Sequence, residues 1–126
     1  MSKFRSRLEE RVRKKLSSGW KYEEEEMEYT SCHIYNPDFS KGDVHIEVKG
    51  RFRTSGEASK YISVRDCNPG IILIFVFQSG TTPMPAARRR RDGTKFTMGE
   101  WADKNGFLWL NEDEVSDKKI KELLGL

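Results

Sequence analysis

"IILIFVFQ" (71–78) contains seven consecutive apolar side chains. Successive side chains of a β-strand point to opposite faces, so a strand of this composition is apolar on both faces. Strands of this kind lie in the middle of a sheet that is covered on both sides. The stretch therefore predicts a sheet buried between two layers, and the rest of the chain must supply those layers.

Helical and strand patterns alternate around this central strand. The predicted helices span 4–19, 56–67, 97–106 and 116–124. Strands are expected within 20–35, at 44–49 and at 107–110, with a loop over 79–93. Ser6, Thr97 and Ser116 are placed to cap three of the helices. Helices and strands in this order predict an α/β fold with a mixed, layered architecture.

The length of 126 residues fits one compact domain, which we expect to span 1–126. The formal net charge is only +3, but the charges are segregated. Seven Lys and Arg lie between Lys3 and Lys15, and residues 88–91 read "RRRR". Acids gather in "YEEEEMEY" (22–29), which predicts a solvated strand edge that discourages pairing. The basic patches favour a polyanionic partner.

The cysteines and the hydropathy exclude several classes of protein. Cys32 and Cys67 stand far apart without a second pair, which argues against a disulfide framework or a zinc site. No apolar run reaches the length of a membrane span, and the first residues lack the apolar segment of a signal peptide. We therefore expect a cytoplasmic protein with no membrane partner and no small-molecule cofactor.

A predicted hairpin carries charged side chains on one of its faces. A turn at "SKGD" (40–43) would place Asp38 opposite His45 and diagonal to Glu47, with the Cβ atoms of the two acids roughly 7 Å apart. Lys49, two residues beyond Glu47, shares their face. Two carboxylates within reach of one ion predict a site for a hard divalent cation, with an ammonium group beside it.

This set of residues suits the hydrolysis of a phosphodiester. The carboxylates would hold Mg²⁺, which lowers the pKa of bound water and neutralises charge on the phosphate oxygens. Lys49 would orient the attacking water and stabilise the developing negative charge. Each part also has an ordinary interpretation, because "PD" occurs in many turns and "ExK" on an exposed strand is commonly a solvated ion pair.

Taken together, "NPDF" (36–39) and "EVKG" (47–50) match the "PD…(D/E)xK" signature of restriction-endonuclease-like nucleases. Further blocks extend the match in the same order. These are "FRSRLEERV" (4–12), "YNPDF" (35–39), "HIEVKG" (45–50), "NPGIILIFVF" (68–77) and "GEWADKNGF" (99–107). With these blocks the chain resembles the phage endonuclease I family of Holliday-junction resolvases.

The resemblance implies both a fold and an activity. The fold would be restriction-endonuclease-like, with a mixed central sheet flanked by helices, in an intertwined homodimer. The dimer would nick paired strands at four-way DNA junctions with Mg²⁺ or Mn²⁺, in the host cytoplasm if a phage encodes it. The N-terminal helix and strands, about 4–30, would be exchanged between subunits through a bridge around Thr30–Ile34.

The resemblance also assigns roles to individual residues. Asp38 and Glu47 match metal-binding carboxylates, Lys49 matches a catalytic lysine, and the backbone carbonyl of Val48 matches a further metal ligand. Glu9 matches a helical glutamate that takes part in catalysis and metal binding. Its position leaves a second interpretation open, since Glu9 follows Ser6 at the spacing of a capping box and would then only close the first turn.

Basic residues provide candidate contacts to DNA. They are Arg5, Arg7, Arg11, Arg51, Arg53, Lys60, Arg88, Arg89, Arg90 and Arg91. Contacts of this type read the phosphate backbone, so they predict recognition by shape and not by base sequence. The alternative for residues 88–91 is a solvated, disordered run without a ligand.

The combined hypothesis is a dimeric, Mg²⁺-dependent, structure-selective DNA endonuclease that resolves four-way junctions. One alternative is a nuclease of the same fold that cuts or nicks ordinary duplex DNA. The other is a DNA-binding module without chemistry, in which the acids are structural.

Overall fold

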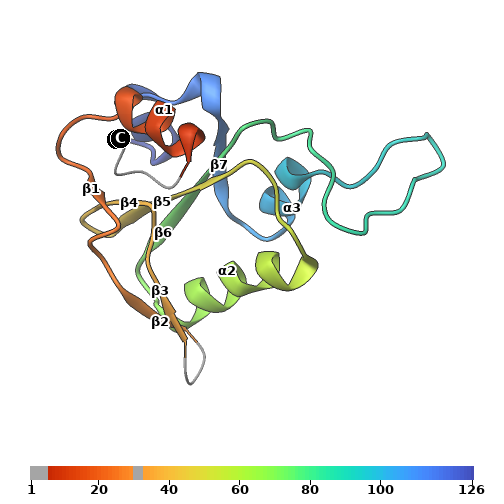
Figure 1. The fold of residues 1–126 in the computed structure, drawn as a ribbon, viewed down its shortest axis with the longest axis horizontal. Helices are drawn as coiled ribbons and strands as arrows, with labels where there is room; N and C mark the ends of the chain where they lie inside the picture. The colour runs from red at the N-terminus through yellow and green to blue at the C-terminus, as the bar shows by residue number, and fades with distance from the viewer. Residues whose placement is uncertain (1–5, 30–32) are drawn as a thin grey trace.

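The computed structural model describes residues 6–29 and 33–126 as a five-stranded mixed sheet with helices on both faces, which confirms the predicted fold class (Figure 1). The helices are α1 (Arg7–Lys15), α2 (Ser55–Cys67), α3 (Met98–Lys104) and α4 (Asp117–Leu123), with a 3-10 turn η1 (Glu112–Glu114). The strands are β1 (Lys21–Tyr22), β2 (Met27–Tyr29), β3 (His33–Tyr35), β4 (Phe39–Lys41), β5 (Val44–Lys49), β6 (Ile72–Phe77) and β7 (Leu108–Asn111). The sheet order is β1-β4-β5-β6-β7.

The strand β6 lies inside the sheet, parallel to β5 on one side and to β7 on the other. Alternate side chains of β6 enter two separate cores. Leu73, Phe75 and Phe77 face one core, while Ile74 and Val76 face the other. The prediction of a central strand buried on both faces is therefore confirmed, with Ile72 at its start 38% exposed.

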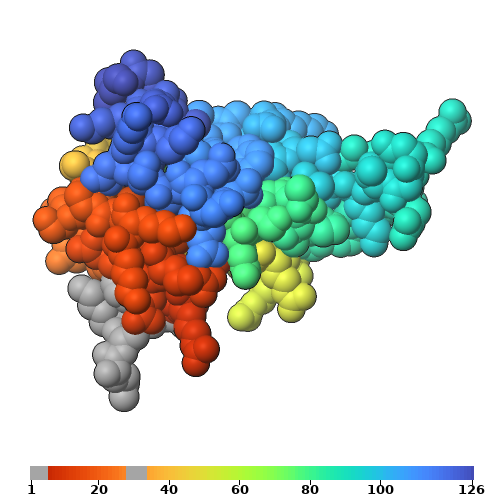
Figure 2. Space-filling model, turned by 90° about the horizontal axis from the view of Figure 1, so that it is seen from above, coloured from red at the N-terminus to blue at the C-terminus, as the bar shows by residue number. Residues whose placement is uncertain are grey.

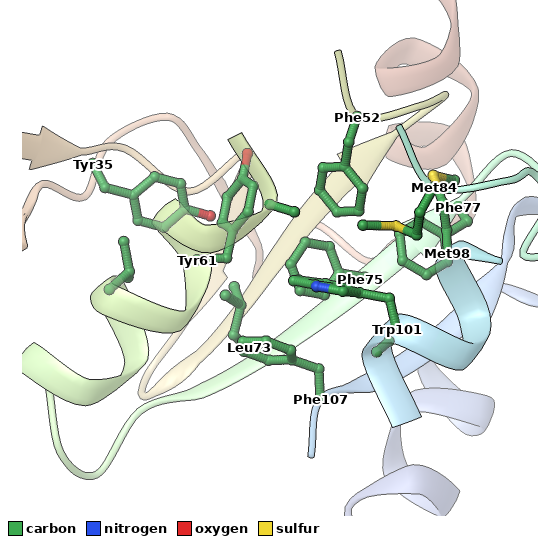
Figure 3. Packing of buried hydrophobic residues seen from close by; sticks show 13 residues of the cluster. Tyr35, Phe52, Tyr61, Leu73, Phe75, Phe77, Met84, Met98, Trp101 and Phe107 are labelled. Atoms are coloured by element: carbon green, nitrogen blue, oxygen red, sulfur yellow. The ribbon is translucent and has the colours of Figure 1, made fainter. Parts of the chain in front are cut away.

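The two cores lie on opposite faces of the sheet. One is largely aromatic and packs α2 and α3 against the sheet, with Tyr61 and Trp101 among its members (Figure 3). The other packs α1 and α4 against the opposite face through Val12 and Ile120 (Figure 1). Both helix layers that the central strand required are present.

Three helix starts follow the sequence. Ser6, Thr97 and Ser116 each accept a hydrogen bond from the backbone N–H three residues later, and Thr97 forms a complete capping box. The first helix ends at Lys15, earlier than predicted, because Leu16 adopts extended backbone angles. In the part of the chain that the structure describes, no helix is long and apolar enough to span a membrane.

The hairpin that carries the candidate acids differs from the prediction. A two-residue turn, Gly42–Asp43, joins β4 to β5, and Phe39 pairs with Ile46 instead of Val44. The predicted four-residue loop at 40–43 is wrong. Gly42 has a φ of +61°, a conformation that glycine adopts without steric cost, so the chain reverses within two residues.

The segment between α1 and β4 forms three short strands. The strand β1 pairs with β4 at the edge of the main sheet, while β2 and β3 pair with each other as a separate two-stranded hairpin. The turn of that hairpin includes 30–32, outside the described residues, so the predicted bridge around Thr30–Ile34 falls partly beyond the description. In this single chain, α1 packs on the sheet of its own subunit.

Residues 79–97 form an arm that projects from the body of the molecule, in cyan at the right of Figure 2. Isolated bridges join Pro83 to Thr97 and Arg89 to Lys95, so the arm is a loosely paired hairpin without regular strands. Met84 anchors its base in the aromatic core. The predicted loop is therefore folded back on itself and carries the four consecutive arginines outward.

Candidate active site

Three carboxylates converge at the edge of the sheet beside β4. Glu9 comes from the first turn of α1, Glu23 follows β1, and Asp38 precedes β4. Carboxylate oxygens of the three residues all lie within 4.8 Å of one another. Glu9 and Asp38 are each 8% exposed. Acids this close repel one another unless a cation or a proton lies among them.

Glu9 both takes part in the helix cap and directs its carboxylate to the acid cluster. Ser6 caps the helix by accepting the Glu9 N–H at 3.1 Å. The carboxylate of Glu9 accepts hydrogen bonds from the Ser6 hydroxyl at 3.3 Å and from the Tyr22 hydroxyl at 2.7 Å. Its side chain is thus directed to the acid cluster, while its backbone is part of the cap.

Glu23 is an acid of the cluster that sequence reasoning assigned to a solvated strand edge. Its φ of +52° is uncommon for a residue with a side chain. Its N–H donates to the Asp38 carbonyl at 3.1 Å. This turn directly after β1 brings the side chain to the cluster. A run of four glutamates gives no signal for which of them the backbone will direct inward.

Asp38 takes over a backbone hydrogen bond at the end of the hairpin. Its Oδ2 accepts the Val48 N–H at 2.8 Å. If the register of β4 and β5 is continued, Val48 lies opposite Pro37 in a hydrogen-bonded position of the ladder. Proline has no N–H, so Pro37 cannot donate to the Val48 carbonyl. The side of β5 that faces Asp38 therefore presents a carbonyl oxygen next to a carboxylate.

Burial raises the pKa of Asp38 to about 9, and repulsion from the Glu47 carboxylate adds to the increase. The Glu9 carboxylate raises this pKa further, while the hydrogen bond from Val48 and the charge of Lys49 lower it. Asp38 is thus a carboxyl that the folded chain holds protonated at neutral pH in the absence of a cation.

Glu47 and Lys49 form the second half of the site. They are two residues apart on β5, so both side chains lie on the same face of the sheet. Glu47 is 5% exposed, and burial raises its pKa. Its Oε1 accepts from the Tyr35 hydroxyl at 2.5 Å, and its Oε2 accepts from the Tyr61 hydroxyl at 3.1 Å. The Lys49 ammonium lies 3.4 Å from Glu47 Oε2 and 3.4 Å from Glu57 Oε2.

The three acids and bases predicted from the motif, Asp38, Glu47 and Lys49, therefore lie close together at the end of β5. Asp38 contacts the backbone at Val48, between Glu47 and Lys49, and is close enough to Glu47 for the two carboxylates to repel. Glu47 does not belong to the close cluster that contains Glu9. His45, which was predicted to lie opposite Asp38, pairs with Ser40 and shares a 2.7 Å hydrogen bond with its hydroxyl.

The candidate DNA contacts occupy several surfaces. Arg5 lies outside the described residues, Arg7 is exposed, and Arg11 forms a two-point ion pair with Glu112. Lys60 lies over the rings of Tyr35 and Tyr61. An open groove leads from the end of β5 to the arm. It is lined by Arg51, Phe52, Arg53, Thr82, Pro83, Pro85 and Ala86.

The four arginines of the arm are exposed, but they are not equivalent. Arg90 forms an ion pair with Glu100 at 2.8 Å, and the side chain of Arg89 donates to the Gly93 carbonyl at 3.2 Å. Within the described residues, Arg88 and Arg91 have no ion pair. These two residues are therefore the arginines of the arm best placed to bind an external anion.

Comparison with known proteins identifies the family of this chain. The model of the family described as phage endonuclease I matches residues 1–123. Endonuclease I of Escherichia phage T7 is 33% identical over 116 residues, which cover 86% of this chain and 73% of the phage protein. Homology of this extent supports a nuclease that acts on DNA. The chain belongs to the phage endonuclease I family.

Proposed function

We propose that the chain is a divalent-metal-dependent endonuclease that resolves four-way DNA junctions by paired nicks, working as a homodimer. The observation that carries the proposal is the convergence of Glu9, Glu23 and Asp38 beside Val48, next to the Glu47–Lys49 pair. The exposed arginines of the arm supply the contacts that a phosphate backbone requires.

The chemistry of the donor set fits Mg²⁺ or Mn²⁺. Three carboxylates within 4.8 Å of one another, one of them with a strongly raised pKa, form a site in which a hard cation would replace a proton. Glu9, Asp38, Glu47 and the Val48 carbonyl would hold the ion, and Glu23 belongs to the same close cluster as Glu9 and Asp38. When bound, such an ion lowers the pKa of a coordinated water and neutralises charge on the phosphate.

Lys49 would act on the other side of the scissile phosphate. Its ammonium lies 3.4 Å from both Glu47 and Glu57, and these two contacts fix its direction. From this position it would orient the attacking water and stabilise the negative charge that develops on the phosphate oxygens. A role for Lys49 as general base is not part of the proposal.

A substrate with two strands to cut favours two linked sites. The β2–β3 hairpin joins α1 and β1 to the rest of the chain, and we propose that its opening exchanges residues of about 4–30 between subunits. Glu9 of one chain would then complete the site of the other.

Mixed dimers test the exchange. We expect a heterodimer of a Glu9→Ala chain and a Lys49→Ala chain to recover nicking, because an exchanged dimer contains one site with both wild-type residues. The nicking rate of the purified heterodimer, made with two affinity tags, measures this. If each chain completes its own site, both sites lack a residue and the heterodimer stays as inactive as the two homodimers.

A comparison of substrates tests the main proposal. The protein should cut a four-way junction in Mg²⁺ much faster than a linear duplex of the same sequence, and in Ca²⁺ it should bind the junction without cutting it. Equal rates on both substrates would instead favour the duplex nuclease. Binding without cleavage in both Mg²⁺ and Mn²⁺ would favour a DNA-binding module.

The arm gives a separate prediction about affinity. We expect the Arg88→Ala/Arg91→Ala protein to bind the junction more weakly and with a shallower salt dependence, by roughly 0.9 in the log–log slope for each phosphate that the variant no longer neutralises. Binding in Ca²⁺ at several salt concentrations measures this. Lys118→Ala, an exposed cation on α4, is the control. An unchanged slope in the double variant would place the arm outside the interface.

A further inference from the structure

Glu47 is held by two tyrosines that sequence reasoning did not single out. Tyr35 is at the end of β3, just before the β4–β5 hairpin, and Tyr61 is in the middle of α2. The Tyr35 hydroxyl donates to one carboxylate oxygen at 2.5 Å, and the Tyr61 hydroxyl donates to the other at 3.1 Å. Both oxygens of one buried acid are thus bonded by elements that meet only in the folded chain.

The positions of both hydroxyls are fixed by aromatic packing. Tyr35 and Tyr61 are 4% and 0% exposed, and their rings meet edge to face with centroids 5.6 Å apart. Tyr61 also packs edge to face on Phe75 at 5.1 Å. Figure 3 shows the two rings side by side at one end of the aromatic core. Two hydroxyls on buried, packed rings restrict the rotamer of the carboxylate that bridges them.

The two hydrogen bonds leave capacity on the carboxylate. An ionised carboxylate has about four lone-pair positions on its two oxygens, and each phenol occupies one. Glu47 is therefore oriented, with a further position for a ligand on Oε1, while Oε2 also faces the Lys49 ammonium at 3.4 Å.

The helix α2 acts on both charged residues of the motif. Tyr61 donates to Glu47, and Glu57, one turn earlier, pairs with Lys49 at 3.4 Å. A tyrosine that merely satisfied its own hydroxyl in the core would need one acceptor of any kind. Here two tyrosines share one acid, and that acid occupies the position of a metal ligand in the proposed site.

We propose that Tyr35 and Tyr61 are positioning residues that hold Glu47 in its metal-binding orientation through their phenol hydroxyls. The inference rests on the proposed function, in which Glu47 binds a divalent cation. Outer-shell partners of metal ligands typically contribute 10–100-fold to metal affinity or activity. We expect a contribution of this size here.

The test uses Tyr35→Phe, Tyr61→Phe and the double variant, which keep both rings and remove only the hydroxyls. Calorimetric titration with Mn²⁺, without DNA, should show an affinity roughly 10-fold weaker for a single variant and up to about 100-fold weaker for the double variant. The Mg²⁺ concentration for half-maximal junction cleavage should rise in parallel, with a smaller change in the rate at saturating Mg²⁺.

Val64→Ala is the matched control. Val64 is fully buried in the same core and on the same helix, and its side chain has no polar atom. We expect this variant to lose thermal stability and keep the Mn²⁺ affinity of the wild type. Wild-type Mn²⁺ affinity in the folded double variant would overturn the inference, as would an affinity loss in Val64→Ala equal to that of the tyrosine variants.

A second measurement does not depend on a bound metal. In a crystal structure of the metal-free double variant, Glu47 should occupy a different rotamer or several rotamers, and an unchanged single rotamer would overturn the inference. Wild-type protein that binds Mn²⁺ but cuts no DNA would overturn the proposed function and leave the positioning role intact. Wild-type protein that binds no Mn²⁺ would overturn both.

Discussion

The Glu47→Gln protein should cut a four-way junction about 1,000-fold more slowly than the wild type, a loss of roughly 4 kcal/mol in transition-state stabilisation. The substitution keeps the size of the side chain and its place between Tyr35 and Tyr61. It removes the negative charge that would hold the cation and that fixes the Lys49 ammonium at 3.4 Å. The defect should therefore fall on the chemical step.

Single-turnover cleavage in saturating Mg²⁺ measures this loss, and junction binding in Ca²⁺ shows that the substrate site is intact. Glu112→Gln is a suitable control, because Glu112 is a partly buried acid that pairs with Arg11 outside the cluster. Cleavage by Glu47→Gln within tenfold of the wild type would mean that this acid does not take part in catalysis.

The Asp38→Asn protein should be more stable than the wild type at pH 8 in the absence of divalent ions, by about 1–3 kcal/mol in the free energy of unfolding. The pKa of Asp38 is about 9 in the folded chain against an ordinary value of 3.8. Between these pH values the folded state holds a proton that the unfolded state has lost, so stability falls as the pH rises. Asparagine does not titrate, and its side-chain oxygen can still accept the Val48 N–H.

Urea unfolding at pH 4 and pH 8 in EDTA tests this expectation. The difference between the two proteins should be small at pH 4 and large at pH 8. Added Mg²⁺ should stabilise the wild type at pH 8 and have little effect on Asp38→Asn, since a ligand that binds only the folded state raises its stability. A variant less stable than the wild type at both pH values would contradict the assignment.

Much of the fold could be predicted because its signals are local. Seven apolar residues in succession identify β6, and capping residues such as Thr97 mark helix starts. The hairpin at Gly42 was predicted with the wrong register, because glycine allows both a two-residue and a four-residue turn and the choice depends on how β4 packs. The arm was predicted as a loop. Its pairing could not be predicted, because it depends on hydrogen bonds between residues distant in the sequence, such as the one from the Met84 N–H to the Phe96 carbonyl.

The candidate site divides in the same way. Asp38, Glu47 and Lys49 were predicted from a motif with fixed spacing, and the structure places them along β5. Glu23 was missed because its direction depends on a positive φ that the sequence does not mark. Tyr61 was missed because a tyrosine inside a helix has the pattern of any core residue, and its acceptor is 14 residues away.

Pro37 determines which backbone hydrogen bonds can form beside the acids of the motif. An alanine at this position would have an amide hydrogen to offer Val48, and the hairpin would close one pair further. The Val48 carbonyl oxygen, which the resemblance assigns to the cation, would then accept this hydrogen bond within the sheet. In this fold the proline and the aspartate of "NPDF" act together, because Pro37 has no N–H to donate to the Val48 carbonyl and the Asp38 carboxylate accepts the Val48 N–H.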